Sequence, residues 1–308
     1  MIYFDTMTKY PVMLLEGKRV LLYGCGGGYD IYASFFLYQE LIRKNTVYLA
    51  NYSFTDDLYT YADKTIIKVT PDLVRTKKNR EYFPEHILSQ FLQVPVYTVR
   101  LLGPNQVIPA LTELCQKLTI DTLIAIDAGH DALLFGDEGE DRGSPLEDMI
   151  SMVSIASIDL PIQKLLACVS APTESIPWHL FGKHLSMMKA AGGFLGRCRY
   201  EGDIQSFKEL LDRTPSETRS IPNECLLAAM EGRLGRNYQN PRLQCRMTTD
   251  GCGELEYPHV TEETAYYYYF DINTLVKTSP LLQSLMTGVN CDSLQVNAII
   301  NGFYANRS

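Results

Sequence analysis

Eight acidic side chains lie between positions 127 and 148, directly after the apolar run 122–126. They are Asp127, Asp131, Asp137, Glu138, Glu140, Asp141, Glu147 and Asp148. Neighbouring carboxylates can bind a hard cation such as Mg²⁺, or they can contact sugar hydroxyls and act as general acid and base. Two close carboxylates also raise the pKa of one of them, which suits proton transfer. This segment is therefore the first candidate for chemistry.

Local structure explains part of this acidity. Ser144 and Glu147 have the spacing of a capping box at the start of a helix, so we interpret Glu147 and Asp148 as helix-terminal residues. Glu140 and Asp141 are expected in a solvated loop.

Four acids then remain as functional candidates. The predicted catalytic side chains are Asp131, Asp137 and Glu138, together with His130 as an acid or base. A structural role for His130 is an equal alternative. The predicted ligands of a metal ion are Asp127 and Asp131, with Mg²⁺ as a candidate and the cofactor otherwise unknown.

A glycine-rich turn, GCGGGYD, forms the second candidate site. It lies between an expected strand over 18–23 and an expected helix over 31–44. Glycines let the backbone approach a ligand closely, and a helix N-terminus favours an anion. The predicted ligand-binding residues are Gly24, Gly26, Gly27, Gly28, Asp30, Asn51 and Gly129.

The turn matches the dinucleotide fingerprint GxGxxG only in part. Tyr29 occupies the third glycine position, and Asn51 ends the next strand where an acidic residue is usual. We therefore favour a non-standard anion or nucleotide site over an ordinary NAD site. A tight turn without a ligand is the alternative. Cys25 lies near the expected helix N-terminus, which would lower its pKa, so a reactive thiol is a minor hypothesis.

Strand-like and helix-like segments alternate along most of the chain. The expected strands cover 18–23, 46–51, 65–69, 94–100, 122–126, 165–170 and 264–270. The pattern predicts a Rossmann-like, doubly wound α/β fold with a mostly parallel sheet and helices on both faces. We expect a single domain over 1–308, with a C-terminal elaboration from about residue 200. Ligands bind beyond the carboxyl ends of such strands, so the polar segments 24–30, 127–138 and 170–174 should converge.

Composition limits the functional classes. The 308-residue chain has a net charge of −8, which disfavours nucleic acid and anionic membranes as partners. It has no apolar run long enough for a membrane span and no signal-peptide pattern, so we expect a cytoplasmic protein. The eight cysteines are scattered, and only Cys245 and Cys252 lie close together in a polar segment. The arginines at 233, 236, 242 and 246 could close over an anion, although a solvated loop explains them better.

Several motifs in this order resemble the family called Domain of Unknown Function 1152. They are GGGYD, YFPE at 82–85, DAGHDALLFGDE at 127–138, GSPLED at 143–148, GGFLG at 192–196 and EETAYYYYFD at 262–271. The resemblance covers most of the chain. It implies an α/β fold and a shared site, and it carries no known reaction.

The sequence thus predicts an enzyme that acts on a nucleotide-, nucleoside- or phosphosugar-like small molecule. Hydrolysis or group transfer by carboxylates opposite the glycine turn is the expected chemistry. A non-catalytic ligand sensor or scaffold on the same fold is the alternative, a protein–protein interaction module is a third class, and the oligomeric state is open. Carboxylates would repel an anionic ligand unless a cation, a proton or sugar hydroxyls lie between them.

Overall fold

One eight-stranded sheet organises the chain. The computed structural model describes residues 15–53, 55, 64–74, 82–139, 145–171, 178–215, 218–236 and 259–306. The order across the sheet is β3-β4-β2-β1-β5-β6-β10-β7. Its parallel centre consists of β4 (Val96–Arg100), β2 (Thr46–Ser53), β1 (Arg19–Gly24), β5 (Thr122–Ala128) and β6 (Gln163–Val169). The predicted doubly wound, mostly parallel α/β fold is confirmed.

The edges of the sheet are antiparallel. On one side β3 (Ile66–Val69) pairs with β4, and on the other β10 (Tyr267–Asp271) pairs with both β6 and β7 (Phe194–Cys198). Because β10 comes from the C-terminal part of the chain and lies inside the sheet, the segment after residue 200 shares the main core. A separate two-stranded ribbon joins β8 (Gly235–Arg236) to β9 (His259–Val260).

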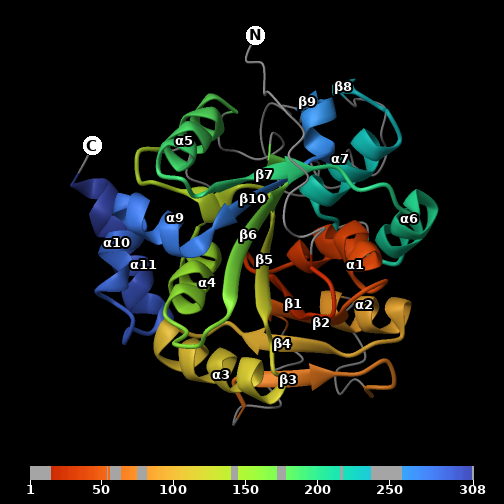
Figure 1. Cartoon of the computed structure of the whole chain (residues 1–308), viewed down its shortest axis with the longest axis horizontal. Helices are drawn as coiled ribbons and strands as arrows, with labels where there is room; N and C mark the ends of the chain where they lie inside the picture. The colour runs from red at the N-terminus through yellow and green to blue at the C-terminus, as the bar shows by residue number, and fades with distance from the viewer. Residues whose placement is uncertain are drawn as a thin grey trace.

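Helices cover both faces of the sheet (Figure 1). One face packs against α3 (Pro104–Lys117), α4 (Leu146–Ala156), α5 (Trp178–Ala190), α9 (Ile272–Thr278), α10 (Pro280–Met286) and α11 (Ser293–Ala305). The other packs against α1 (Phe35–Leu41), α2 (Pro84–Leu92), α6 (Ile204–Asp212) and α7 (Ile221–Met230). Alternate side chains of β1 point to the two faces: Leu21 and Tyr23 join the first core, Val20 and Leu22 the second.

No helix in the described part of the chain has both the length and the apolar character that a membrane crossing requires.

One observed element near the glycine turn differs from the element that the sequence predicted. A helix was expected to start at Ile31, directly after the glycine turn. Instead a 3₁₀ turn, η2 (Asp30–Ser34), comes first, and the seven-residue α1 follows it. The prediction of a long helix with its N-terminus at the turn was therefore wrong. The reason is local: η2 begins within the turn, where the Asp30 amide donates to the Gly27 carbonyl at 3.2 Å.

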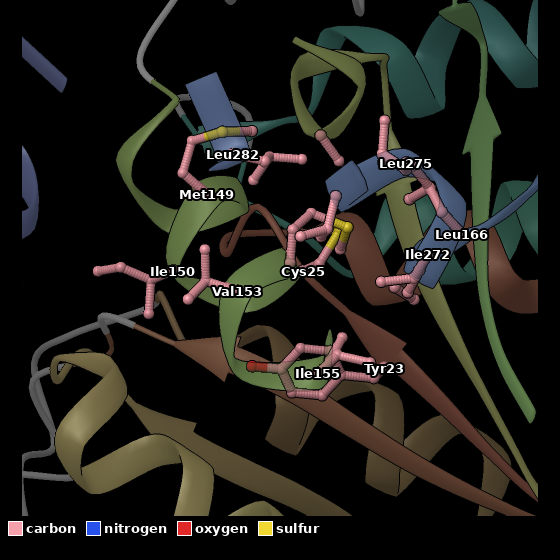
Figure 2. Packing of buried hydrophobic residues seen from close by; sticks show 14 of the residues in the cluster. Tyr23, Cys25, Met149, Ile150, Val153, Ile155, Leu166, Ile272, Leu275 and Leu282 are labelled. Carbon is pink, nitrogen blue, oxygen red and sulfur yellow. The ribbon is translucent and has the colours of Figure 1, made fainter. Parts of the chain in front are cut away.

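Apolar packing fixes the end of β1. Tyr23 and Cys25 lie in the same core cluster as Met149 and Val153 of α4 and Leu275 of α9 (Figure 2). All five side chains are at most 2% exposed. Burial of this kind stabilises each large side chain by about 1.5–3 kcal/mol. It also fixes α4 against the end of β1, so the first turn of α4 faces the glycine turn.

Candidate functional site

The candidate site lies where the strand order reverses. From β1 the chain continues to β2 on one side, whereas β5, on the other side of β1, continues to β6. The two connections diverge at this point, which leaves a crevice beyond the carboxyl ends of β1 and β5. The glycine turn follows β1 and the acidic segment follows β5, so the predicted convergence of these two segments is observed. The backbone joins them directly, because the Cys25 amide donates to the Ile126 carbonyl at 2.9 Å.

The glycine turn folds back on itself. Gly27 and Gly28 have φ angles of +83° and +55°, a region that favours glycine. The Gly26 amide donates to the Asp30 carboxylate, with 2.6 Å between Gly26 N and Asp30 Oδ2. The sequence predicted that the Gly26 amide would bind the phosphate of a ligand, but this amide is hydrogen-bonded within the turn. The turn therefore presents the Asp30 carboxylate instead of a free amide, and α1 has only seven residues, so the turn does not have the features of an anion site.

Asn51 supports the turn from the end of β2. Its side-chain amide donates to the Gly28 carbonyl at 3.1 Å and to Glu85 Oε1 at 2.6 Å. A Cβ at Gly24 would lie 2.1 Å from Asn51 Oδ1 and 2.7 Å from the Ile31 amide nitrogen. Gly24 is therefore required for packing against Asn51. Both residues position the turn, and Asn51 is fully buried.

Four carboxyl groups converge beside the turn: Asp30, Asp127, Asp131 and Asp148. Asp127 and Asp148 are only 3% and 4% exposed, whereas Asp30 and Asp131 are partly exposed. Asp127 Oδ2 accepts a hydrogen bond from the Ala132 amide at 2.8 Å. That bond fixes the 3₁₀ turn η4 (Asp131–Leu133), which carries Asp131. We call these four residues the acidic cluster.

Burial and mutual repulsion raise the pKa values in the acidic cluster. Burial raises the pKa of Asp30 to about 8; the charge on Asp131 adds to this, and hydrogen bonds from the Gly26 and Ala128 backbone oppose it. Burial also raises the pKa values of Asp127 and Asp148 well above the usual range, and neighbouring carboxylates raise them further. At neutral pH the cluster must therefore hold protons or bind another positive group.

Asp148 belongs to this cluster, and its interpretation as a helix-terminal residue only was wrong. Helix α4 begins after Pro145, which makes no side-chain cap, and Ser144 lies outside the described residues. Asp148 in the first turn of α4 is buried beside Cys25, with 3.6 Å between Cys25 Sγ and Asp148 Oδ1. Glu147 lies at the edge of the same region, since its charge raises the pKa of Asp30.

Cys25 is not an activated thiol. Burial raises its pKa well above the usual value, and the charges of Asp148 and Asp127 raise it further. Its thiol donates to the Ile126 carbonyl at 3.2 Å. The lowered pKa that the sequence suggested is therefore wrong, because carboxylates rather than a helix N-terminus surround the sulfur.

Asp137 and Glu138 are held in a different set of contacts. Asp137 forms an ion pair with Lys183 and accepts from His184 Nε2 at 2.8 Å. Glu138 accepts from the amides of Phe135 and Gly136 and, at 2.6 Å, from the Tyr304 hydroxyl. These bonds fasten α5 and α11 to the loop after β5. The structure thus gives both residues structural contacts and does not bring them to the glycine turn.

His130 is fully buried. Its ring lies edge-on to Phe181, with 5.1 Å between the ring centroids. Burial lowers the pKa of His130 to about 3, and the nearby His184 lowers it further. His130 is therefore neutral at physiological pH. Gly129, just before it, has a φ of +151° and lets the chain turn out of β5.

The third polar segment is described only in part. Ser170, directly after β6, has a left-handed φ of +60°, and its hydroxyl donates to the Thr264 carbonyl at 3.4 Å. Several sequence candidates lie outside the described residues: Glu140, Asp141, Glu174, Arg242, Cys245, Arg246 and Cys252.

Two groups in the described part of the chain have the composition and spacing of a metal site. Cys25, Asp30 and Asp148 each offer one ligand atom, and these atoms lie within 4.8 Å of one another. Asp137, Glu138 and His184 do the same. In the second group the carboxylates already accept from Lys183, His184, Tyr304 and backbone amides. The first group has fewer donors and a greater need for a cation.

Comparison with known proteins identifies the family. The family model described as "Protein of unknown function (DUF1152)" matches residues 53–301. The chain therefore belongs to this family, as its motifs indicated. The match includes the acidic segment after β5 and begins after the glycine turn. Neither the curated proteins nor the solved structures contain a significant match to the chain.

Proposed function

We propose that this protein is an enzyme that hydrolyses, or transfers a group from, a nucleotide-, nucleoside- or phosphosugar-like small molecule at the acidic cluster. One observation carries the proposal: four carboxyl groups meet at the switch point between β1 and β5, and two of them are at least nine-tenths buried. Structural needs alone do not explain such a concentration of like charge, which costs folding free energy.

The chemistry of the cluster favours a ligand with cationic or hydroxyl groups facing it. Because the Gly26 amide already donates to Asp30, a phosphate would bind here by coordinating a divalent cation held by the carboxylates. A ribose-like ligand could instead donate its hydroxyls directly. In both cases the positive or donor group lies between the carboxylates and any anionic part of the ligand.

The carboxyl groups of the cluster would have different roles, because they differ in solvent exposure. Asp131 is partly exposed on a short 3₁₀ turn, so it is the best placed to act as general base or to contact the ligand. Asp127 holds that turn in place by accepting a hydrogen bond from the Ala132 amide. Asp30 has a raised pKa in the absence of a cation, so near neutral pH it holds a proton that a bound cation would displace.

A non-catalytic sensor on the same fold remains the second candidate. A panel of nucleotides, nucleosides and sugar phosphates, with and without Mg²⁺ or Mn²⁺, separates the two in a thermal-shift assay followed by product analysis. Stabilisation with turnover supports the enzyme, and stabilisation without turnover supports the sensor. If no compound in the panel stabilises the protein in either condition, the proposal fails.

Asp131→Asn is the variant that tests the role of the cluster. We expect it to lower kcat by about 100-fold or more, the size usual for a positioned general base. The melting temperature should stay nearly unchanged, because Asp131 is partly exposed. Asp159→Asn, an exposed acid at the start of the connection to β6, is the matched control and should retain full activity. A large loss of stability in Asp131→Asn would instead indicate a structural carboxylate.

A further inference from the structure

A thiol and two carboxylates face one another at the base of the acidic cluster. One ligand atom from each of Cys25, Asp30 and Asp148 lies within 4.8 Å of the other two. A second thiol borders the same group of acids: Cys168 Sγ lies 3.8 Å from Asp127 Oδ2. Cys25 leaves the end of β1, Asp30 opens η2, and Asp148 lies in the first turn of α4. Three separate elements thus bring sulfur and oxygen to one point.

Asp148 supplies an independent indication that this point binds a ligand. It is 4% exposed, yet among the described residues its one hydrogen-bond donor is the weak thiol of Cys25. Glu138, which is equally buried, accepts from two backbone amides and a tyrosine hydroxyl. A buried carboxylate without strong donors is costly unless a cation or a proton neutralises it.

Both oxygens of Asp148 point at the glycine turn. A Cβ at Gly26 would lie 2.8 and 2.9 Å from these two oxygens and 2.6 Å from Asp30 Oδ2. A side chain at Gly26 would therefore overlap both carboxylates, so only glycine lets their oxygens come this close to the backbone of the turn. A single bare cation is the kind of ligand that fits between two carboxylates and a sulfur at this separation.

We propose that Cys25, Asp30 and Asp148 bind one thiophilic divalent cation of the Zn²⁺ class. The proposal deepens the proposed function, on which it rests, by naming the metal class at that site. Sulfur ligands favour Zn²⁺ and Co²⁺ over Mg²⁺ and Ca²⁺, which prefer all-oxygen sites. On binding, the Cys25 thiol releases its proton to solvent and the thiolate takes its place as the ligand.

The number of protein ligands indicates a catalytic rather than a structural metal. Structural zinc sites use four protein ligands, whereas catalytic sites use three and leave one position for water or substrate. Three residues meet here, and the partly exposed Asp131 and Asp30 lie toward the solvent side. A metal held by these three residues would lower the pKa of a bound water, and Asp131, in the same acidic cluster, is a carboxylate that could accept its proton.

Cobalt titration of the metal-free full-length protein tests this assignment. A Co²⁺–thiolate bond gives a charge-transfer absorption in the near ultraviolet, which carboxylate ligands alone do not produce. We expect this band to saturate at one Co²⁺ per chain, and a large excess of Mg²⁺ should not remove it. Zn²⁺ should displace the cobalt and abolish the band.

Variants assign the signal to individual residues. Cys25→Ser keeps a donor for the Ile126 carbonyl and should lose the band, whereas Cys291→Ser, a partly exposed cysteine outside the cluster, should keep it. Asp148→Asn should weaken Co²⁺ binding by at least about 100-fold, since even outer-shell changes cost 10–100-fold. Circular dichroism checks that each variant is folded. If Cys25→Ser does not fold, the Co²⁺ affinity of Asp148→Asn tests the site instead.

Cobalt binding without the charge-transfer band, an unchanged band in Cys25→Ser, or no cobalt binding at all would overturn the metal assignment. These failures are distinct from failure of the proposed function. A protein that binds no cobalt but still turns over a nucleotide-like compound, and loses that turnover in Asp131→Asn, would keep the function and lose the metal.

Discussion

Replacing Asp30 by asparagine should flatten the pH dependence of stability in the metal-free protein. The pKa of Asp30 is raised from 3.8 in the unfolded chain to about 8 in the folded protein. Between these two values the folded state binds more protons than the unfolded state, so stability falls as the pH rises. The contribution of Asp30 is therefore fully present below about pH 4 and is lost as the pH rises through about 8.

The size of the effect follows from the shift. Each unit of pKa difference corresponds to about 1.4 kcal/mol, which sets an upper limit of about 6 kcal/mol for Asp30. Water reaches this side chain in part, and Asp131 and Asp127 share its charge, so we expect about half, or ~3 kcal/mol, between pH 5 and 8. The asparagine of the Asp30→Asn variant would not titrate, and its side-chain oxygen could still accept from the Gly26 amide.

The assay is chemical unfolding with EDTA present, at pH values between 5 and 8.5. The wild-type free energy of unfolding should decline by ~3 kcal/mol or more across this range, and Asp30→Asn should make that slope shallower. Asp127 and Asp148, whose pKa values are also raised, account for the slope that remains. Asp203→Asn is the control: Asp203 is an exposed N-cap of α6 with a lowered pKa, so it stays charged throughout and should leave the slope unchanged. A wild-type stability that is flat or rises from pH 5 to 8, or an unaltered slope in Asp30→Asn, would show that Asp30 does not hold a proton in the folded protein.

Two further substitutions probe separate contacts. Tyr304→Phe should lower the free energy of unfolding by about 1.5–2 kcal/mol in chemical denaturation. It removes one hydrogen bond to the buried Glu138 carboxylate and leaves the two backbone donors in place. No loss of stability would mean that α11 is held by apolar packing alone. Gly26→Ala keeps an allowed backbone conformation, since Gly26 is outside the left-handed region. Its methyl group would lie 2.6–2.9 Å from oxygens of Asp30 and Asp148, so both carboxylates must move and cobalt binding should be lost. Gly182→Ala in α5, where the added methyl meets nothing, should bind cobalt normally.

The sheet could be predicted from the sequence because each central strand is an apolar run of its own. The run 122–126 predicted β5, which extends only two residues further, to Ala128. By contrast α11 was missed, although Asp292 and Gln295 form a capping box at its start that the sequence displays. A search of the last twenty residues for capping boxes would have found it. The antiparallel β7 was missed because GFLGRC is short and rich in glycine.

The membership of the acidic cluster could not be fully predicted. Its two halves were expected to converge, since both follow parallel strands. Whether a particular acid points into the cluster depends on contacts between residues far apart in the chain. Asp148 meets Cys25 across 123 positions and Glu138 meets Tyr304 across 166. Local capping and turn rules assign such residues by their neighbours in sequence, and here those rules pointed away from Asp148 and toward Glu138.

A crystal structure of the protein grown with Co²⁺ and AMP would test the metal assignment and the ligand site together. Anomalous scattering at the cobalt edge locates the metal without assumptions about the ligand. We expect an anomalous peak beyond the ends of β1 and β5, where Cys25, Asp30 and Asp148 bind the metal, with the nucleotide near Asp131. A peak at Asp137 and His184 instead, or a nucleotide bound away from the acidic cluster, would contradict it.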